Sequence, residues 1–271
     1  MIKQAIIPLA GLGTRLLPLT SVIPKELLPI NGKPGLEYIL DECIQSGIKE
    51  FIFIISKKKL SIKDYFYKDA FYRKLIRIKR KDKRLKLEYS KIKKYKKMIK
   101  FVYQNSPKGT GHAVLQCKNL VNSKYFLMIM PDDLIIKNNC SKNLIKIHKK
   151  HNASVIAAKK VDKKDVSRWG IFDLKKLNKS SFLIKDVIEK PSIKNAPSNY
   201  AIIGRYILPK EIFQILQGQK PGQNGEIHIT DAIKALIEKK EKFIGYNFAG
   251  KYLDCGTLKG YINSSIEISK L

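Results

Sequence analysis

The first 56 residues contain the pattern that most limits how this chain can fold. An apolar segment, residues 2–11, is short enough for one strand and ends at a glycine, and residues 34–46 then place apolar side chains at helical spacing. Residues 48–56 form a second apolar run rich in isoleucine and phenylalanine, which is typical of a strand buried on both faces. Strand, helix and strand in this order predict a parallel strand pair joined by a helical crossover.

The rest of the chain continues this alternation. We expect strands at residues 98–104, 125–130, 153–161, 170–174, 182–191, 200–208 and twice within 241–256, and helices at 111–121, 141–152, 211–219, 228–240 and 266–271. The strands at 170–174 and 182–191 are expected to be antiparallel, because a short, turn-rich link joins them. Residues 57–100, a basic segment without glycine or proline, predict two amphipathic helices. Since no internal repeat or low-complexity linker appears, residues 1–271 are expected to form a single domain.

The net charge of the chain is unusually high. It carries 54 Lys and Arg residues against 23 Asp and Glu residues, a formal charge of +31. Phosphate contacts with nucleic acid, attraction of a small polyanionic substrate, and a composition biased toward lysine, isoleucine and asparagine would each explain this excess. Because lysines occur along most of the chain, compositional bias fits best, and charge alone does not decide the function.

Cysteine content and hydropathy indicate the compartment. The four cysteines form no C-x-x-C pair and are too sparse for a disulfide scaffold. No apolar run approaches the ~18 residues needed to span a bilayer, and the apolar N-terminal segment lacks a small-residue cleavage site. We therefore expect a cytoplasmic protein with free thiols and no membrane partner.

A glycine-rich turn follows the first predicted strand. Gly11 and Gly13 allow the backbone to approach a ligand at the carboxyl end of that strand, where open α/β sheets bind their ligands. Arg15 can add a planar fork of donors, and Lys25 a mobile positive charge. The turn is not the dinucleotide fingerprint, because Leu16 stands where a third glycine is needed, and it is not a Walker A loop. It is consistent with a site for phosphate groups.

The motifs along the whole chain resemble those of the sugar-phosphate nucleotidylyltransferases. G-L-G-T-R-L-L-P is followed by P-K-E-L-L-P-I and K-P, and then, in the family's order, by QNSPKGTGHAV, IMPDDLI, WGIFD, VIEKP, APSNYAIIGRYIL, GEIHITDAI and LDCGTLKGY. Within that family the chain most resembles the bacterial UTP–glucose-1-phosphate uridylyltransferases, in which A-P-S-N, the D-C-G ending and a helical insertion before the base-binding Gln are typical. Gly35, Glu37 and His228 depart from the family pattern, and the insertion is more basic than in relatives.

The resemblance implies an α/β fold: a Rossmann-like, three-layer α/β/α nucleotidyltransferase with a mixed, mainly parallel central sheet and a small antiparallel sugar-binding sheet. It divides the domain into a nucleotide-binding half, about 1–135, and a sugar-phosphate-binding half, about 136–271, with the basic helical insertion at about 57–100. A homodimer or homotetramer is also implied.

The resemblance further implies roles for individual residues. The nucleotide would contact Ala10, Gly11, Gly13, Thr14, Gln104, Gly109 and Gly111. Catalysis would depend on Arg15, Lys25 and Lys190, and the sugar would contact Gly170, Glu189 and Lys190. Mg²⁺ would be held by Asp132 and Asp254, because hard oxygen ligands and substrate phosphates are what this ion prefers. Asp133 is the alternative to Asp132 as the metal ligand. Asp254 either binds the metal directly or contacts the groups that bind it.

The implied reaction joins UTP and glucose 1-phosphate into UDP-glucose and pyrophosphate. An oxygen of glucose 1-phosphate attacks the α-phosphorus of UTP, and the cationic residues offset the repulsion between two polyanions. A glucose-1-phosphate thymidylyltransferase, using dTTP, is the nearest alternative, and it depends on the space beside C5 of the base. A nucleic-acid-binding protein that uses residues 57–100 is a distant alternative, because the aromatic residues there fall at helical spacing, which suits burial better than base stacking.

Overall fold

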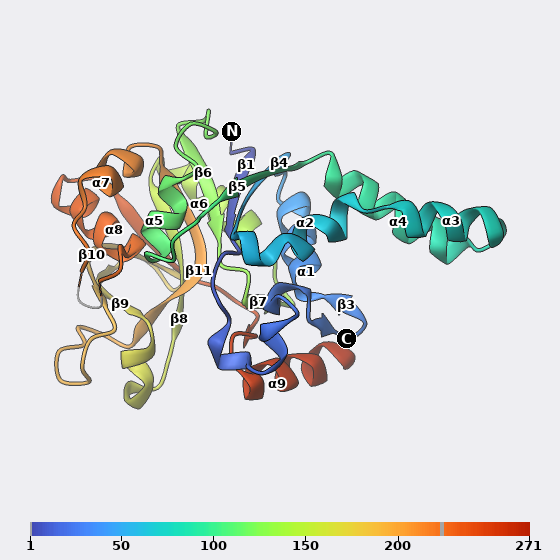
Figure 1. The fold of residues 1–271 in the computed structure, drawn as a ribbon. Helices are drawn as coiled ribbons and strands as arrows, with labels where there is room; N and C mark the ends of the chain where they lie inside the picture. The colour runs from blue at the N-terminus through green and yellow to red at the C-terminus, as the bar shows by residue number, and fades with distance from the viewer. Residues whose placement is uncertain (1, 223–224) are drawn as a thin grey trace.

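A nine-stranded sheet forms the centre of the computed structural model, which describes residues 2–222 and 225–271 (Figure 1). Its strands lie in the order β5 (Ile99–Tyr103), β4 (Glu50–Ile55), β1 (Gln4–Pro8), β6 (Tyr125–Ile129), β11 (Tyr200–Pro209), β8 (Ser154–Lys160), β12 (Phe243–Asn247), β10 (Ser181–Glu189) and β9 (Gly170–Lys176). The predicted first unit is present, because β1 and β4 are parallel and α1 (Gly35–Gln45) connects them.

The sheet is mixed, as expected, but its parallel part is smaller than the resemblance implied. β5, β4, β1 and β6 are parallel neighbours, and so are β8 and β12. β11 runs against both β6 and β8, and β10 runs against both β12 and β9, so that only four of the eight neighbouring pairs are parallel. β9 and β10 form the expected antiparallel pair, but they continue the main sheet instead of making a separate small one.

Helices cover both faces of the sheet, which gives the three expected layers. Successive residues of β1 point to opposite faces: Ile7 packs in one apolar cluster and Ile6 in the other. The first cluster lies against α1, α2 (Leu60–Tyr67), α6 (Cys140–His151) and the C-terminal helix α9 (Leu258–Ser269). The second lies against α5 (Thr110–Leu115), α7 (Ile212–Gly218) and α8 (Ile229–Glu238). All four cysteines are buried and free, and no helix in the described ranges is long and apolar enough to cross a bilayer.

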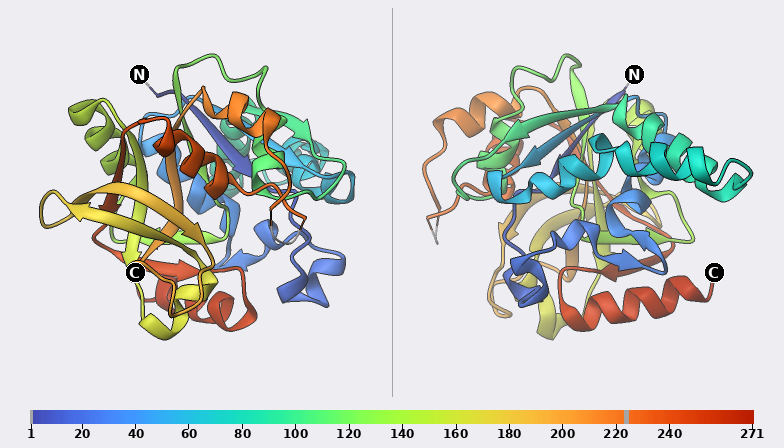
Figure 2. Two further views of the ribbon diagram at one scale, coloured as in Figure 1. Left: turned by 90° about the vertical axis from the view of Figure 1, so that its left-hand side faces the viewer. Right: turned by 45° about the vertical axis from the view of Figure 1, so that its right-hand side comes forward.

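The basic segment 57–100 contains three α-helices where two were predicted. α2 packs on the body through Ile62 and Phe66 and ends near Lys68, after which α3 (Ala70–Ile78) and α4 (Lys83–Lys96) form a hairpin that projects from the body (Figures 1 and 2). Residues 57–100 hold 20 Lys and Arg against 4 Asp and Glu, which is +16 of the total +31. Over half of the net charge is therefore concentrated in this segment, although lysines also occur along the rest of the chain.

Several shorter elements differ from the sequence predictions. Two two-stranded sheets were not foreseen: β7 (Asp133–Ile136) with β13 (Lys251–Asp254), and β2 (Pro29–Ile30) with β3 (Lys33–Pro34). β12 and β13 were expected as a final strand pair, but each pairs elsewhere.

Two helices have different ends from those predicted. α5 stops at Leu115, where turns begin. α9 starts eight residues earlier than predicted. The prediction missed its first two turns because the apolar Leu258 and Ile262 are exposed while Ser264 is buried, so the buried face does not show the usual apolar periodicity.

A buried ion pair joins α1 to β11. Arg205 is completely buried and donates from Nε and Nη2 to the Glu42 carboxylate at 2.8–3.2 Å. The Arg205 Nη1 group also donates to the carbonyls of Met130 and Gly204. Burial would raise the pKa of Glu42, but the Arg205 charge together with hydrogen bonds from Arg205 and Ser141 outweighs it and holds that pKa below its usual value. The pair therefore fixes α1 to the end of β6, where the site described next begins.

Candidate functional site

The carboxyl ends of β1 and β6 lie side by side and open into two adjoining cavities. The parallel pairing of β1 with β6 places the glycine turn, residues 10–13, next to residues 130–133. The sheet curls so that β9 returns to β11, where Ile171 pairs with Ala201. This curl, visible in the yellow and orange strands of Figure 2, carries Gly170 and Glu189 back to the same side of the molecule.

The first cavity has a volume of about 380 Å³ and contains most of the predicted nucleotide-binding residues. Its lining includes Ala10, Gly11, Gly13, Thr14, Arg15, Lys25, Gln104, Gly109 and Asp132. Gly13 has a φ of 72°, a left-handed conformation that suits glycine, and it begins the 3-10 helix η1 (Thr14–Leu16) that carries Arg15. Gly111 does not belong to this lining.

The second cavity, of about 550 Å³, contains the predicted sugar-side residues Gly170, Glu189 and Lys190 and the predicted metal ligand Asp254. It shares part of its wall with the first cavity. The shared residues are Arg15, Thr110, Met130, Asp132 and Glu226. Arg15 and Asp132, which the sequence places 117 positions apart, therefore meet where the two cavities join.

Lys25 and Asp132 form an ion pair at this junction, with Lys25 Nζ 2.5 Å from Asp132 Oδ2. Lys25 lies in the 3-10 helix η3 (Lys25–Leu27), and each side chain is less than one-fifth exposed. Burial lowers the pKa of Lys25, but the charges of Asp132 and Glu26 outweigh it and hold that pKa above its usual value. Burial raises the pKa of Asp132, but the Lys25 charge together with hydrogen bonds from Lys25 and the main chain outweighs it and keeps that pKa below its usual value. Both groups are therefore charged at neutral pH.

Asp254 faces Asp132 across Gly256. A Cβ atom added to Gly256 would lie 2.8 Å from Asp132 Oδ2 and 3.1 Å from Asp254 Oδ1. The main chain joins the two segments as well, because the Cys255 N–H donates to the Asp132 carbonyl at 2.8 Å. Arg168 Nη2 lies 3.2 Å from Asp254 Oδ2. Two carboxylates thus lie on neighbouring segments at the junction of the cavities.

Asp133 has its two oxygens engaged by the protein. The Tyr252 hydroxyl donates to Oδ1 at 2.7 Å, and the Gly204 N–H donates to Oδ2 at 2.9 Å. Burial, followed by the charge of Asp132, raises the pKa of Asp133 to about 6. These bonds make Asp133 part of the scaffold that holds β7 against β11 and β13.

The donor set at the junction suits a magnesium ion that is completed by substrate oxygens. Among residues 2–222 and 225–271, no group of three or more His, Cys, Asp or Glu side chains could hold a metal on its own. Mg²⁺ is usually bound by one or two carboxylates together with substrate phosphates. The facing carboxylates of Asp132 and Asp254, with hard oxygen atoms beside a cavity, fit this requirement.

Gln104 lies at the end of β5 and is nearly buried. Its amide nitrogen donates to the Gly109 carbonyl at 3.2 Å and contacts His112 Nδ1 at 2.9 Å. Burial, followed by the charge of Lys108, lowers the pKa of His112, so the imidazole is neutral and its Nδ1 can accept this hydrogen bond. The two donor positions of the Gln104 amide are thereby used within the protein.

Gly109 and Gly111 are packed closely against residues 226–227. A Cβ on Gly109, whose φ is 96°, would lie 2.6 Å from the Ile227 carbonyl oxygen, and one on Gly111 would lie 2.9 Å from the same atom. Ile227 donates its N–H to the Lys108 carbonyl and accepts from the Gly111 N–H, both at 2.8 Å. These glycines therefore allow one part of the chain to pack on another.

Sequence reasoning missed several residues of the site. Glu226, which lines both cavities, and Thr230, which donates to Glu189 Oε2 at 2.7 Å, lie within the GEIHITDAI motif but received no role. His112 was missed in the same way, although it lies within QNSPKGTGHAV. Their positions in otherwise recognised motifs were the available signal.

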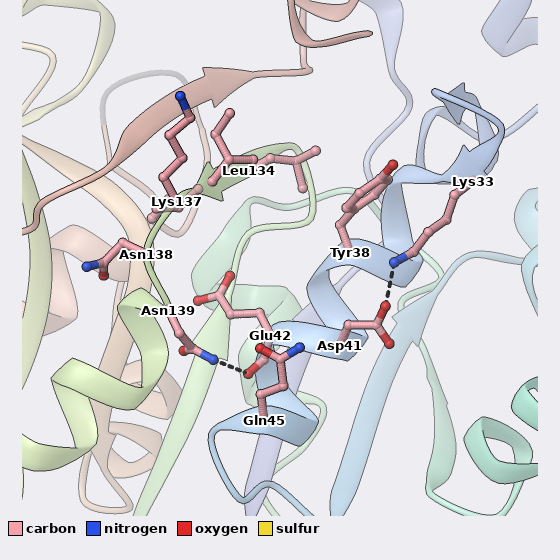
Figure 3. Close-up of a pocket in the computed structure, with 11 residues that line it drawn as sticks. Lys33, Tyr38, Asp41, Glu42, Gln45, Leu134, Lys137, Asn138 and Asn139 are labelled. Carbon is pink, nitrogen blue, oxygen red and sulfur yellow. Dashed lines mark hydrogen bonds and ion pairs between the residues drawn. The ribbon is translucent and has the colours of Figure 1, made fainter. Parts of the chain in front are cut away.

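A third cavity of about 370 Å³ lies between α1 and the segment after β7 (Figure 3). Asp41 forms an ion pair with Lys33 there, and Asn139 donates to the Glu42 carbonyl at 3.1 Å. The residues that line it differ from those that the sequence predicted for the site, so the two cavities that share Arg15 and Asp132 are the candidate active site.

Comparisons with known proteins agree with this geometry. Residues 4–270 match the family model described as "Nucleotidyl transferase". The chain is 38% identical to a UTP–glucose-1-phosphate uridylyltransferase of Bacillus subtilis, covering 99% of this chain and 91% of that protein. It is 39% identical to the enzyme of the same name from Streptococcus pyogenes, covering 98% and 88%.

Solved structures give the same result for the fold. A UDP-glucose pyrophosphorylase complexed with UDP-glucose has a TM-score of 0.88 and 36% identity, covering 100% of this chain and 99% of that one. A UTP-bound UGPase from Acinetobacter baumannii has a TM-score of 0.89 and 32% identity, covering 99% and 93%. The chain belongs to the nucleotidyl transferase family and, within it, to the UTP–glucose-1-phosphate uridylyltransferases.

Proposed function

We propose that the two cavities hold UTP and glucose 1-phosphate, and that the protein converts them to UDP-glucose and pyrophosphate. The observation that carries the proposal is the shared wall: Arg15 and Asp132 belong to both cavities, so the reacting phosphates of the two substrates would meet there. The nucleotide half, about 1–135, and the sugar-phosphate half, about 136–271, are part of this proposal. So are a homo-oligomeric assembly and a cytoplasmic location.

The cationic residues provide the chemistry. A phosphate oxygen of glucose 1-phosphate attacks the α-phosphorus of UTP in line with the departing pyrophosphate. Because that oxygen is already an anion, no general base is required, and catalysis depends on alignment and on neutralising charge. Arg15 and Lys25 face the triphosphate and the leaving group, while Lys190 faces the phosphate of the sugar.

Asp132 and Asp254 would hold Mg²⁺, which supplies positive charge beside the α-phosphate when it is bound. The engagement of both Asp133 oxygens by Tyr252 and Gly204 supports Asp132 over Asp133 as the ligand. Lys25 pairs with Asp132 in the protein alone, and this contact keeps the ammonium group at the junction where the phosphates would enter.

Gln104 would recognise the base through its carbonyl oxygen. Since its amide nitrogen contacts Gly109 and His112, Oε1 is the atom that can accept a hydrogen bond from the N3–H of uracil. Ala10, Gly11, Gly13, Thr14 and Gly109 line the remainder of the nucleotide cavity. Gly111 would act from outside the cavity by holding residue 227 in place.

Turnover of UTP, glucose 1-phosphate and Mg²⁺, followed by pyrophosphate release, tests the proposal. We expect activity that disappears when EDTA removes the metal, and weaker activity when dTTP replaces UTP or galactose 1-phosphate replaces glucose 1-phosphate. No pyrophosphate from the natural pair would contradict the proposed function, and a preference for dTTP would indicate the thymidylyltransferase alternative. RNA binding that persists well above 0.2 M salt would revive the nucleic-acid alternative.

The role of Lys25 has its own test. Lys25→Ala is expected to lower kcat about 10²-fold or more, which is the scale of losing one preorganised charge contact in a transition state. Lys68→Ala is a matched control, because the exposed Lys68 side chain forms an i,i+4 ion pair with the partly exposed Asp64. A folded Lys25→Ala variant with an unchanged kcat would remove Lys25 from the mechanism.

A further inference from the structure

The Glu189 carboxylate, which ends β10 in the second cavity, uses its two oxygens differently. Oε2 accepts a hydrogen bond of 2.7 Å from the Thr230 hydroxyl. Oε1 lies 3.8 Å from Lys190 Nζ, the next residue along the chain. The side chain is one-quarter exposed, so one part of the carboxylate is held by the protein and another part remains accessible.

The side of the carboxylate that carries Oε2 is closely packed. A Cβ added to Gly170 would lie 3.2 Å from Glu189 Oε2 and 3.1 Å from Thr230 Cγ2. Both distances would be shorter than ordinary van der Waals contact, so there is no room for a side chain at residue 170 beside this part of the carboxylate. Thr230 and Gly170 therefore enclose Oε2, and Oε1 is the oxygen left to meet a ligand.

Thr230 is itself held firmly. It lies in the first turn of α8 and is only 5% exposed. The residues before it are tied to the nucleotide side: Ile227 exchanges two main-chain hydrogen bonds with residues 108 and 111, and the Ile229 N–H donates to Thr110 Oγ1 at 3.3 Å. The hydroxyl that meets Glu189 is thus presented from a fixed position.

We propose that Thr230 is a positioning residue that orients Glu189 for recognition of the hexose hydroxyls and so determines sugar specificity. The inference rests on the proposed function, because it concerns the sugar of glucose 1-phosphate. Without the Thr230 hydroxyl, Oε2 loses its donor in a closely packed place, and the nearest cation is Lys190. The carboxylate then turns toward Lys190, which removes one group from the hexose and a second from the sugar phosphate.

Thr230→Val tests this proposal, because it removes the hydroxyl while keeping the shape of the side chain. Losing a hydrogen bond to a charged group corresponds to about a 10- to 100-fold effect. We expect the KM for glucose 1-phosphate to rise by that factor, while the KM for UTP changes less than twofold. The preference in kcat/KM for glucose 1-phosphate over galactose 1-phosphate should fall, because a carboxylate turned toward Lys190 no longer distinguishes the orientations of the hexose hydroxyls.

Thr230→Ser is the matched control and should restore the KM for glucose 1-phosphate, because it restores the hydroxyl. In a Glu189→Gln background, Thr230→Val should add less than a twofold effect, since Thr230 acts through the carboxylate. A Thr230→Val enzyme with an unchanged KM for glucose 1-phosphate would overturn the inference. An equal rise in both KM values, or a serine variant that fails to recover, would overturn it too.

The two hypotheses can fail separately. A wild-type protein that does not turn over UTP and glucose 1-phosphate would refute the proposed function and this inference with it. An active wild type whose Thr230→Val variant keeps its sugar preference would refute this inference alone. The melting temperatures of the wild type and both Thr230 variants should agree within a few degrees. A Thr230→Val variant with a much lower melting temperature but unchanged kinetics would show that the contact is purely structural.

Discussion

Substituting Gly256 by alanine changes the space between the two facing carboxylates. The added methyl group would lie 2.8 Å from Asp132 Oδ2 and 3.1 Å from Asp254 Oδ1. Ordinary contacts begin at 3.4 Å, so the Asp132 oxygen must retreat by about 0.6 Å and the Asp254 oxygen by about 0.3 Å. The change therefore separates the two groups that we propose hold the metal, and it removes no polar atom.

The size of the effect follows from these displacements. A misplacement of about 1 Å in a catalytic geometry costs about 10²-fold in rate, so a shift of about 0.6 Å corresponds to roughly a 15-fold loss in kcat. We expect the Mg²⁺ concentration needed for half-maximal rate to rise at the same time. The free energy of unfolding should change little, because the carboxylates can move toward the cavity.

Pyrophosphate release measured against Mg²⁺ concentration is the appropriate assay, with urea denaturation to show that the variant is folded. Gly218→Ala is the matched control, because no heavy atom of the described residues, apart from its chain neighbours and its own helix backbone, lies within 4 Å of its Cβ position. A folded Gly256→Ala enzyme with kcat and Mg²⁺ dependence within twofold of the wild type would refute the idea that Asp132 and Asp254 act together.

Three other outcomes are expected. Glu42→Gln leaves the fully buried Arg205 without its anionic partner and should lower the free energy of unfolding by about 3–5 kcal/mol in urea, whereas Asp64→Asn, at an exposed pair, should cost less than about 1 kcal/mol. The folded protein lowers the pKa of Glu42, so the stability that its charge contributes is complete above pH 4.5, the usual pKa, and is lost as the pH falls toward the lower pKa of the folded state. At pH values below 4.5, the urea concentration at the unfolding midpoint should therefore decrease more in the wild type than in Glu42→Gln. Gly109→Ala forces a side chain into a left-handed conformation and against the Ile227 carbonyl, and should raise the KM for UTP more than that for glucose 1-phosphate.

The elements that could be predicted from the sequence are those whose pattern is local. β1, α1 and β4 follow from an apolar run, a helical stripe and a second apolar run, and their order requires the parallel pairing that the structure has. α9 was predicted too short, because its buried side includes a serine and its exposed side holds isoleucines. The curl that pairs β9 with β11 could not be predicted from local sequence patterns either, because it depends on a contact between residues 30 positions apart.

The candidate site was also only partly predictable from the sequence. The motifs identified the residues that face the cavities, from Arg15 to Asp254, because those residue types at those spacings suit phosphates and a divalent cation. They did not identify Thr230, which lies 41 positions from its partner Glu189, or His112, which lies 8 positions from its partner Gln104. A side chain that acts by holding another one has no chemical signature of its own.

The projecting hairpin has a practical use that follows from how it is attached. Tyr67, at the end of α2, donates to the Ile99 carbonyl at 3.3 Å and packs against the Phe101 ring, so both ends of the hairpin are joined at its base. The turn at residues 79–82 lies at the far end, away from the sheet (Figure 1). Exposed turns of this kind tolerate insertions well. A fluorophore or an affinity tag placed there would mark the enzyme or anchor it to a surface while both substrate cavities stay open.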